Sequence, residues 1–77
     1  MDPADEIVGS IASGHLDEAA KAYAAWTMST PDQAESFVTA IKGRRSREAA
    51  RIHMAVTKKT DEISALNLAH TIINGIS

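Results

Sequence analysis

The sequence has no cysteine and only three aromatic residues among 77: one Trp, one Tyr and one Phe. Without cysteine the chain can form neither a disulfide nor a thiolate metal site, so helix packing or self-association must stabilise a small core. No apolar run approaches the ~20 residues that a membrane-spanning helix needs, and the N-terminus is acidic. We therefore expect a single domain over residues 1–77, cytoplasmic, outside the membrane and without a cofactor.

Period-two runs of β-branched residues, which predict strands, are also missing. Apolar residues recur instead at steps of three and four, as in Ala34, Phe37 and Ile41. Typical helix starts and stops separate these stretches at Asp2-Pro3, Gly14, Thr30-Pro31, Gly43, Thr60 and Gly75. The sequence thus predicts an all-α protein, a compact bundle of four to five short helices joined by tight turns.

Three of the helix starts carry specific capping predictions. Residues 30–33 match a capping box, in which the side chains of Thr30 and Gln33 each bond the other residue's backbone N–H. Ser46 is expected to cap the fourth helix. Residues 60–62 are expected to open the fifth, with their acids near its positive end.

Positive charge is confined to one segment. Residues 42–59 hold seven of the eight Lys and Arg residues and one of the ten acidic residues, so the segment carries +6 and the rest of the chain −8. On a helical wheel four basic residues fall within about 60° of one another, opposite the apolar face: Arg44, Arg47, Arg51 and Lys58. Such segregation favours binding to an anionic surface over catalysis.

This basic helix is the candidate binding site. We expect a small regulatory module that docks an anionic partner, first of all the phosphates of a nucleic acid such as DNA, through Arg44, Arg45, Arg47, Arg51, Lys58 and Lys59. Residues 38–52 also fit a helix-turn-helix, and residues 43–46 could hold one phosphate through backbone N–H groups and guanidinium forks. No aromatic lies within 42–59, so modest base selectivity is expected. The alternatives are a solvated helix face, or one paired internally with the acidic helices.

A second hypothesis is a protein–protein interaction factor, an inhibitor or adaptor that contacts no nucleic acid. Its interface would be the basic helix or the acidic helices, since acidic helices can mimic the charge of nucleic acid. The acidic candidates are Asp17, Glu18, Asp32 and Glu35. A homodimer seam on the fifth helix would use Leu68, Ile72 and Ile76, although the favoured interpretation of that wide apolar face is the most buried helix of the bundle.

Catalysis and metal binding are not expected. No pair among His15, His53 and His70 has metal-ligand spacing, and no serine has an identifiable base. His15 is expected at the surface of a helix start. His53 and His70 are expected at half-buried edges of the core.

Residues 14–31 read Gly14-His15-Leu16-Asp17-Glu18-Ala19 and continue to Tyr23, Trp26 and Pro31. This pattern resembles the second helix of a tetratricopeptide-type helical hairpin. A second glycine, Gly43, follows Gly14 by 29 residues and precedes Glu48-Ala49. The resemblance implies antiparallel helix pairs, and a peptide-binding scaffold only with more repeats.

Overall fold

The structure, a computed structural model, describes residues 2–76, which form five helices and no strand. The helices are α1 (Pro3–Ala12), α2 (Leu16–Thr27), α3 (Pro31–Lys42), α4 (Ser46–Thr57) and α5 (Glu62–Ile76). The predicted bundle of short helices with tight turns is therefore confirmed. Within this range no helix is both long and apolar enough to span a bilayer.

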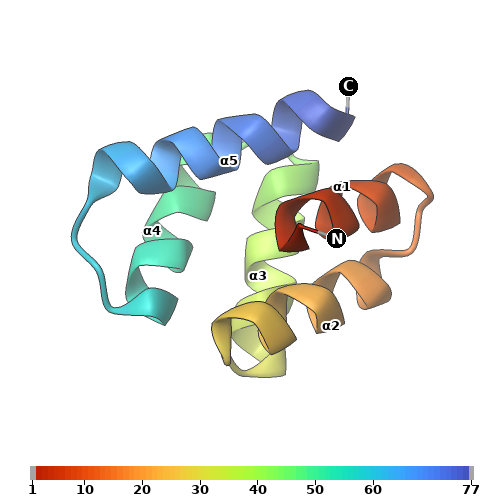
Figure 1. The fold of residues 1–77 in the computed structure, drawn as a ribbon, viewed down its shortest axis with the longest axis horizontal. Coiled ribbons are helices and arrows are strands. Elements are labelled where there is room, and N and C mark those ends of the chain that lie inside the picture. Colours follow the sequence, from red (N-terminus) through yellow and green to blue (C-terminus); the bar gives the residue numbers. More distant parts are fainter. Residues whose placement is uncertain (1, 77) are drawn as a thin grey trace.

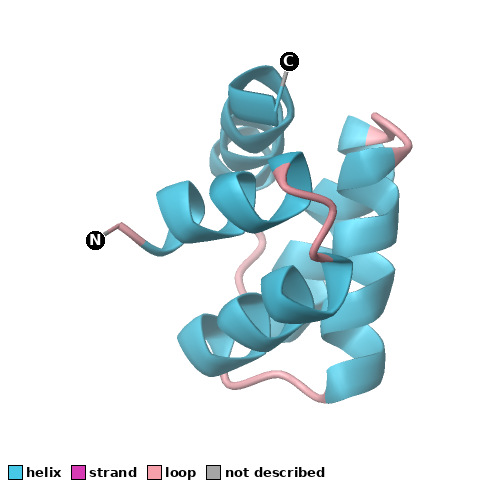
Figure 2. Cartoon of the chain, turned by 90° about the vertical axis from the view of Figure 1, so that its right-hand side faces the viewer, coloured by secondary structure: helices cyan, strands magenta, loops and turns pink. Residues whose placement is uncertain are grey.

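The helices form two hairpins and a closing helix. α1 packs on α2, α3 packs on α4, and α2 packs on α3 to join the two hairpins. Figure 1 shows α5 lying across the hairpins, where it contacts α4 at one end and α1 at the other. The loops between helices are short (Figure 2), so each helix is held against its neighbours in sequence.

The core is built from a few large side chains and several alanines. Tyr23 and Phe37, from α2 and α3, stack with their ring centroids 4.0 Å apart and their planes 9° apart. The other large side chains that are fully buried are isoleucines from α1, α3 and α5: Ile7, Ile41 and Ile72. Because alanines are also fully buried on α2, α3, α4 and α5, the helices can approach one another closely.

Most apolar residues of α5 face the interior, whereas Ile63 near its start is 74% exposed. Ile72 is 0% exposed, and Leu68 and Ile76 pack against the core. These residues therefore stabilise the fold of the chain itself, and Ile72 has no surface to offer a second copy. The favoured interpretation of α5 as the most buried helix is nevertheless wrong, because among the described residues α3 has five buried side chains and α5 has three.

The predicted helix starts are confirmed at α3 and α5 and corrected at α4. At α3 the side chain of Thr30 accepts a bond from Gln33 N (3.2 Å), and Gln33 Oε1 accepts one from Thr30 N (3.1 Å). Ser46 is the first helical residue of α4 and so lies one position too late to cap it.

At α5 the side chain that binds the first turn is that of Asp61. Its Oδ1 accepts a bond from Ser64 N at 3.1 Å, and its Oδ2 accepts one from Ser64 Oγ at 2.6 Å. The hydroxyl and the N–H of Ser64 hold the pKa of this exposed carboxyl below its usual value.

Thr30→Ala is expected to lower the free energy of unfolding by about 1 kcal/mol, because Gln33 N loses its acceptor. Thr60→Ala is the matched control and should leave stability within about 0.5 kcal/mol of the parent, since Asp61 supplies the α5 cap. Denaturant titration of both variants measures the difference. Equal losses would contradict this assignment of the caps.

Candidate functional site

The two hairpins are one structural unit repeated after 30 residues. The turn of the first hairpin has Gly14 in the left-handed conformation (φ 81°), and the turn of the second has Arg44 there (φ 59°). The same bond closes each turn, from His15 N to Ser10 O (2.8 Å) and from Arg45 N to Ala40 O (2.9 Å). The pairing of Gly43 with Gly14 in the sequence is therefore wrong by one residue, because Gly43 has φ −79° and the left-handed position falls on Arg44.

The equivalence continues to the far ends of the hairpins. Met28 and Lys58, again 30 residues apart, are left-handed and terminate α2 and α4. Directly before these residues, Thr27 Oγ1 donates to Tyr23 O and Thr57 Oγ1 donates to His53 O, both at 2.8 Å. A repeated helical hairpin is thus a feature of this structure. Membership of the tetratricopeptide family stays a prediction.

What differs between the hairpins is charge. The basic residues of the second hairpin are Arg44, Arg45, Arg47, Arg51, Lys58 and Lys59, and at the equivalent positions the first has Gly14, His15, Asp17, Lys21, Met28 and Ser29. The first hairpin adopts the same turn although these six positions include only one lysine and one aspartate. The backbone therefore does not require the positive charges of the second.

Four arginines surround one shallow surface hollow of about 500 Å³. This arginine depression is lined by Arg44, Arg45, Ser46, Arg47, Glu48 and Arg51. Arg45 Nε lies 2.8 Å from Glu48 Oε2. Exposed ion pairs of this kind contribute ~0.2–1 kcal/mol to the stability of a protein. No carboxylate within residues 2–76 lies within 4.0 Å of the other three guanidinium groups, so the interpretation of an internally paired basic helix is wrong.

The two lysines lie at the other end of α4. Lys58 and Lys59 line a separate hollow together with Met54 and Glu62. Because an α-helix rises ~1.5 Å per residue, the 12 residues of α4 put about 18 Å between the two ends. Arg44 precedes the helix, so the single stripe drawn on the helical wheel is corrected to two basic clusters.

Backbone N–H groups of the turn are already used. Gly43 N donates to Thr39 O, Arg44 N to Ile41 O and Arg45 N to Ala40 O, at 2.9–3.0 Å. Three of the four N–H groups in the predicted phosphate cradle are therefore not free for an anion, and the guanidinium part of the cradle stays a prediction. The helix-turn-helix assignment stays a prediction.

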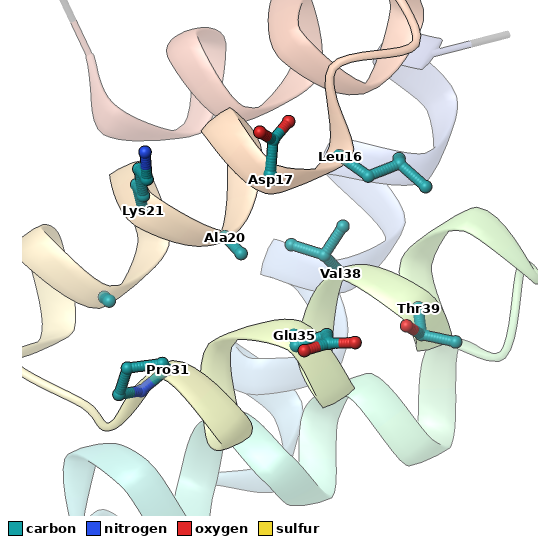
Figure 3. A pocket seen from close by; sticks show the side chains of 9 residues that line it. Leu16, Asp17, Ala20, Lys21, Pro31, Glu35, Val38 and Thr39 are labelled. Carbon is teal, nitrogen blue, oxygen red and sulfur yellow. The ribbon is translucent and has the colours of Figure 1, made fainter.

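The acidic candidates all lie exposed on α2 and α3: Asp17, Glu18, Asp32 and Glu35. Asp17 and Glu35 line a groove between these two helices (Figure 3), which the spacing of residues along the chain does not reveal. Within residues 2–76 no three His, Cys, Asp or Glu side chains are placed to hold a metal ion. His15 is exposed, as predicted, with Nδ1 3.4 Å from Glu18 Oε2. His70 is exposed too, which contradicts the predicted half-buried position.

His53 joins the basic helix to the core. It is half-buried, as predicted, and its Nδ1 lies 2.7 Å from the hydroxyl oxygen of buried Tyr23. The rings of Trp26 and Phe37 lie 5.6 and 6.0 Å from its imidazole. Burial raises the pKa of Tyr23, so its hydroxyl stays protonated. Burial, and then the charge of Lys59, lower the pKa of His53 below 6.5.

Acidification is expected to destabilise the protein through His53. Because its pKa is lower in the folded than in the unfolded chain, the stabilisation is complete above pH 6.5 and is lost as the pH falls from 6.5 through the folded pKa. Denaturant titrations across this range should show a larger loss for the parent than for His53→Gln. The same pH dependence in both proteins would contradict the role assigned to His53.

Arg44→Gly is expected to raise the free energy of unfolding by about 1 kcal/mol, because glycine adopts the left-handed conformation without the strain of a Cβ. Gly14→Ala is the reciprocal control and should lower it by a similar amount. A Cβ at Gly14 would meet no atom within 4 Å, so the loss there comes from the backbone alone. Denaturation midpoints measure both changes, and a destabilised Arg44→Gly would refute the strain.

Three comparisons with known proteins gave no match: no family model matches the chain, and neither a curated protein nor a solved structure is significantly similar to it. Function is therefore inferred from the residues and geometry of the two hairpins.

Proposed function

We propose that this protein is a non-enzymatic, cytoplasmic binding module that docks nucleic-acid phosphates on the arginine depression. The observation that carries the proposal is Arg44. It occupies a left-handed position that the equivalent turn fills with Gly14, and an L-residue there costs roughly 1–2 kcal/mol. Strain retained at an exposed charged residue points to a function for that side chain.

The chemistry of the depression fits phosphate. Guanidinium groups bind phosphate oxygens through pairs of parallel hydrogen bonds, and they keep their charge at any physiological pH. Arg44, Arg47 and Arg51 have no carboxylate partner within 4.0 Å among the described residues, so a bound phosphate would displace no ion pair from them. Their mutual repulsion in the free protein would be relieved by the same event.

The two clusters at the ends of α4 suggest more than one phosphate contact. The arginine depression would hold one stretch of backbone, and Lys58 and Lys59, about 18 Å along the helix, a more distant one. Phosphate contacts fix position without reading sequence. We therefore expect binding that depends strongly on salt and weakly on base sequence.

Labelled duplex DNA, single-stranded DNA and RNA should each be titrated over a range of salt concentrations. Replacing both Arg47 and Arg51 by alanine is expected to reduce the slope of log K against log salt by about 2, since each phosphate contact contributes ~0.9 for duplex DNA. Fluorescence anisotropy measures these affinities. Arg44→Gly should also weaken binding while it stabilises the fold, which separates function from stability.

Lys21→Ala is the matched control, because Lys21 is equivalent to Arg51 in the first hairpin and lies outside the depression. It should leave the slope unchanged within about 0.5. Absence of binding to all three nucleic acids at low salt would refute the proposal and favour an acidic protein partner.

A further inference from the structure

A groove of about 410 Å³ runs between α2 and α3. Its floor is apolar: in Figure 3 the side chains of Leu16, Ala20 and Val38 point into the space between the two helices. Pro31 closes one end, and Asp17, Lys21, Glu35 and Thr39 form the polar margins. The groove thus offers an apolar contact with charged groups beside it.

The charge around this groove is negative. Asp17 and Glu35 line it, and Lys21 is the basic residue among its lining residues. Glu18 and Asp32 lie exposed on the same two helices. None of these four carboxylates has a Lys or Arg partner within 4.0 Å among residues 2–76. A ligand for the groove therefore combines apolar side chains with positive charge.

The chain carries such a surface on its own α4. Arg47, Arg51 and Met54, at steps of four and three, share the outer face of this helix, and Lys58 follows its last residue. Met54 is partly exposed and lines the same hollow as Lys58, whereas Arg47 and Arg51 line the arginine depression. This α4 face therefore combines an apolar side chain with three positive charges, and so it complements the apolar floor and the negative charge of the groove.

The repeat relates the two surfaces to each other. Three residues of the groove have equivalents on the α4 face: Asp17 corresponds to Arg47, Lys21 to Arg51 and Ala24 to Met54. The same region of backbone therefore occurs once in each hairpin. In the first hairpin this surface carries one aspartate and one lysine and borders the groove, whose remaining acidic lining residue is Glu35 of α3. In the second it is basic and carries a larger side chain. The groove with its surplus of carboxylates and the α4 face with its arginines are therefore complementary in charge between two copies.

We propose that the α2–α3 groove of one copy binds the α4 face of a second copy. Met54 would enter the apolar floor, and Arg47 and Arg51 would lie against Asp17 and Glu35. An interface made by one helix in one groove is small, in the range below ~1,200 Å² that is typical of transient complexes. The association is thus weak, weakens with salt and uses different residues from a seam on α5.

The same face of α4 serves the proposed nucleic-acid site, so a nucleic acid and a second copy would exclude each other. Self-association itself does not depend on nucleic-acid binding. It can be measured on nuclease-treated protein, which keeps the failure of one proposal distinct from the failure of the other.

Sedimentation equilibrium of the full chain, near 1 mM protein and at about 50 and about 500 mM salt, tests the contact. We expect association at the lower salt and at least about a tenfold weaker one at the higher. Glu35→Lys disables the groove, Arg51→Glu disables the α4 face, and Ala20→Trp fills the groove without a change of charge. Each should weaken association about tenfold or more.

Mixing the two charge variants gives the decisive result. Glu35→Lys keeps an intact α4 face and Arg51→Glu keeps an intact groove, so the mixture should form a one-to-one complex although each variant alone is monomeric. Lys42→Glu is the matched control for charge, because Lys42 lies outside both surfaces, and it should associate like the parent. A monomeric parent at low salt, or a mixture that stays monomeric, would overturn the proposal.

Discussion

The structure depends on the contact that Tyr23 makes between the two hairpins. Its ring stacks on Phe37 at 4.0 Å, its hydroxyl bonds Nδ1 of His53 at 2.7 Å, and Trp26 meets it edge-on at 5.9 Å. The three aromatic residues of the chain are thus gathered at one place, together with an imidazole. In a chain without cysteine this cluster joins α2, α3 and α4, and it fixes the basic helix to the rest of the molecule.

The second hairpin shows how a shared backbone can carry opposite surface chemistry. Tyr23 and His53 occupy equivalent positions and meet at the centre, where both hairpins contribute to packing. Outside the core, Asp17 is replaced by Arg47 and Gly14 by Arg44 with the turn preserved. Packing constrains the inner positions of α2 and α4, whereas their outer positions are free to differ in charge.

Features that depend on neighbouring residues could be predicted from the sequence, whereas features that depend on contacts between distant residues could not. The capping box at Thr30 and the apolar spacing around Phe37 specify helices through neighbours within one turn, so the sequence reveals them. Gly43 is a typical helix stop and was paired with Gly14, but the left-handed residue of the second turn is Arg44. The bond from Tyr23 to His53 and the groove at Asp17 and Glu35 each need two helices brought together, which periodicity does not encode. Identical residues 30 positions apart do reveal the alignment of the two hairpins. An example is Glu18-Ala19-Ala20, which recurs as Glu48-Ala49-Ala50.

Closure by α5 has a consequence for how the chain behaves as a repeat. Open arrays of helical hairpins gain stability from nearest-neighbour contacts, can fray from either end and can lengthen by adding units. Here α5 packs on both α4 and α1, so the last helix is tied to the first. The two hairpins are therefore coupled into one cooperative unit that unfolds as a whole, and the position a third hairpin would occupy is already filled.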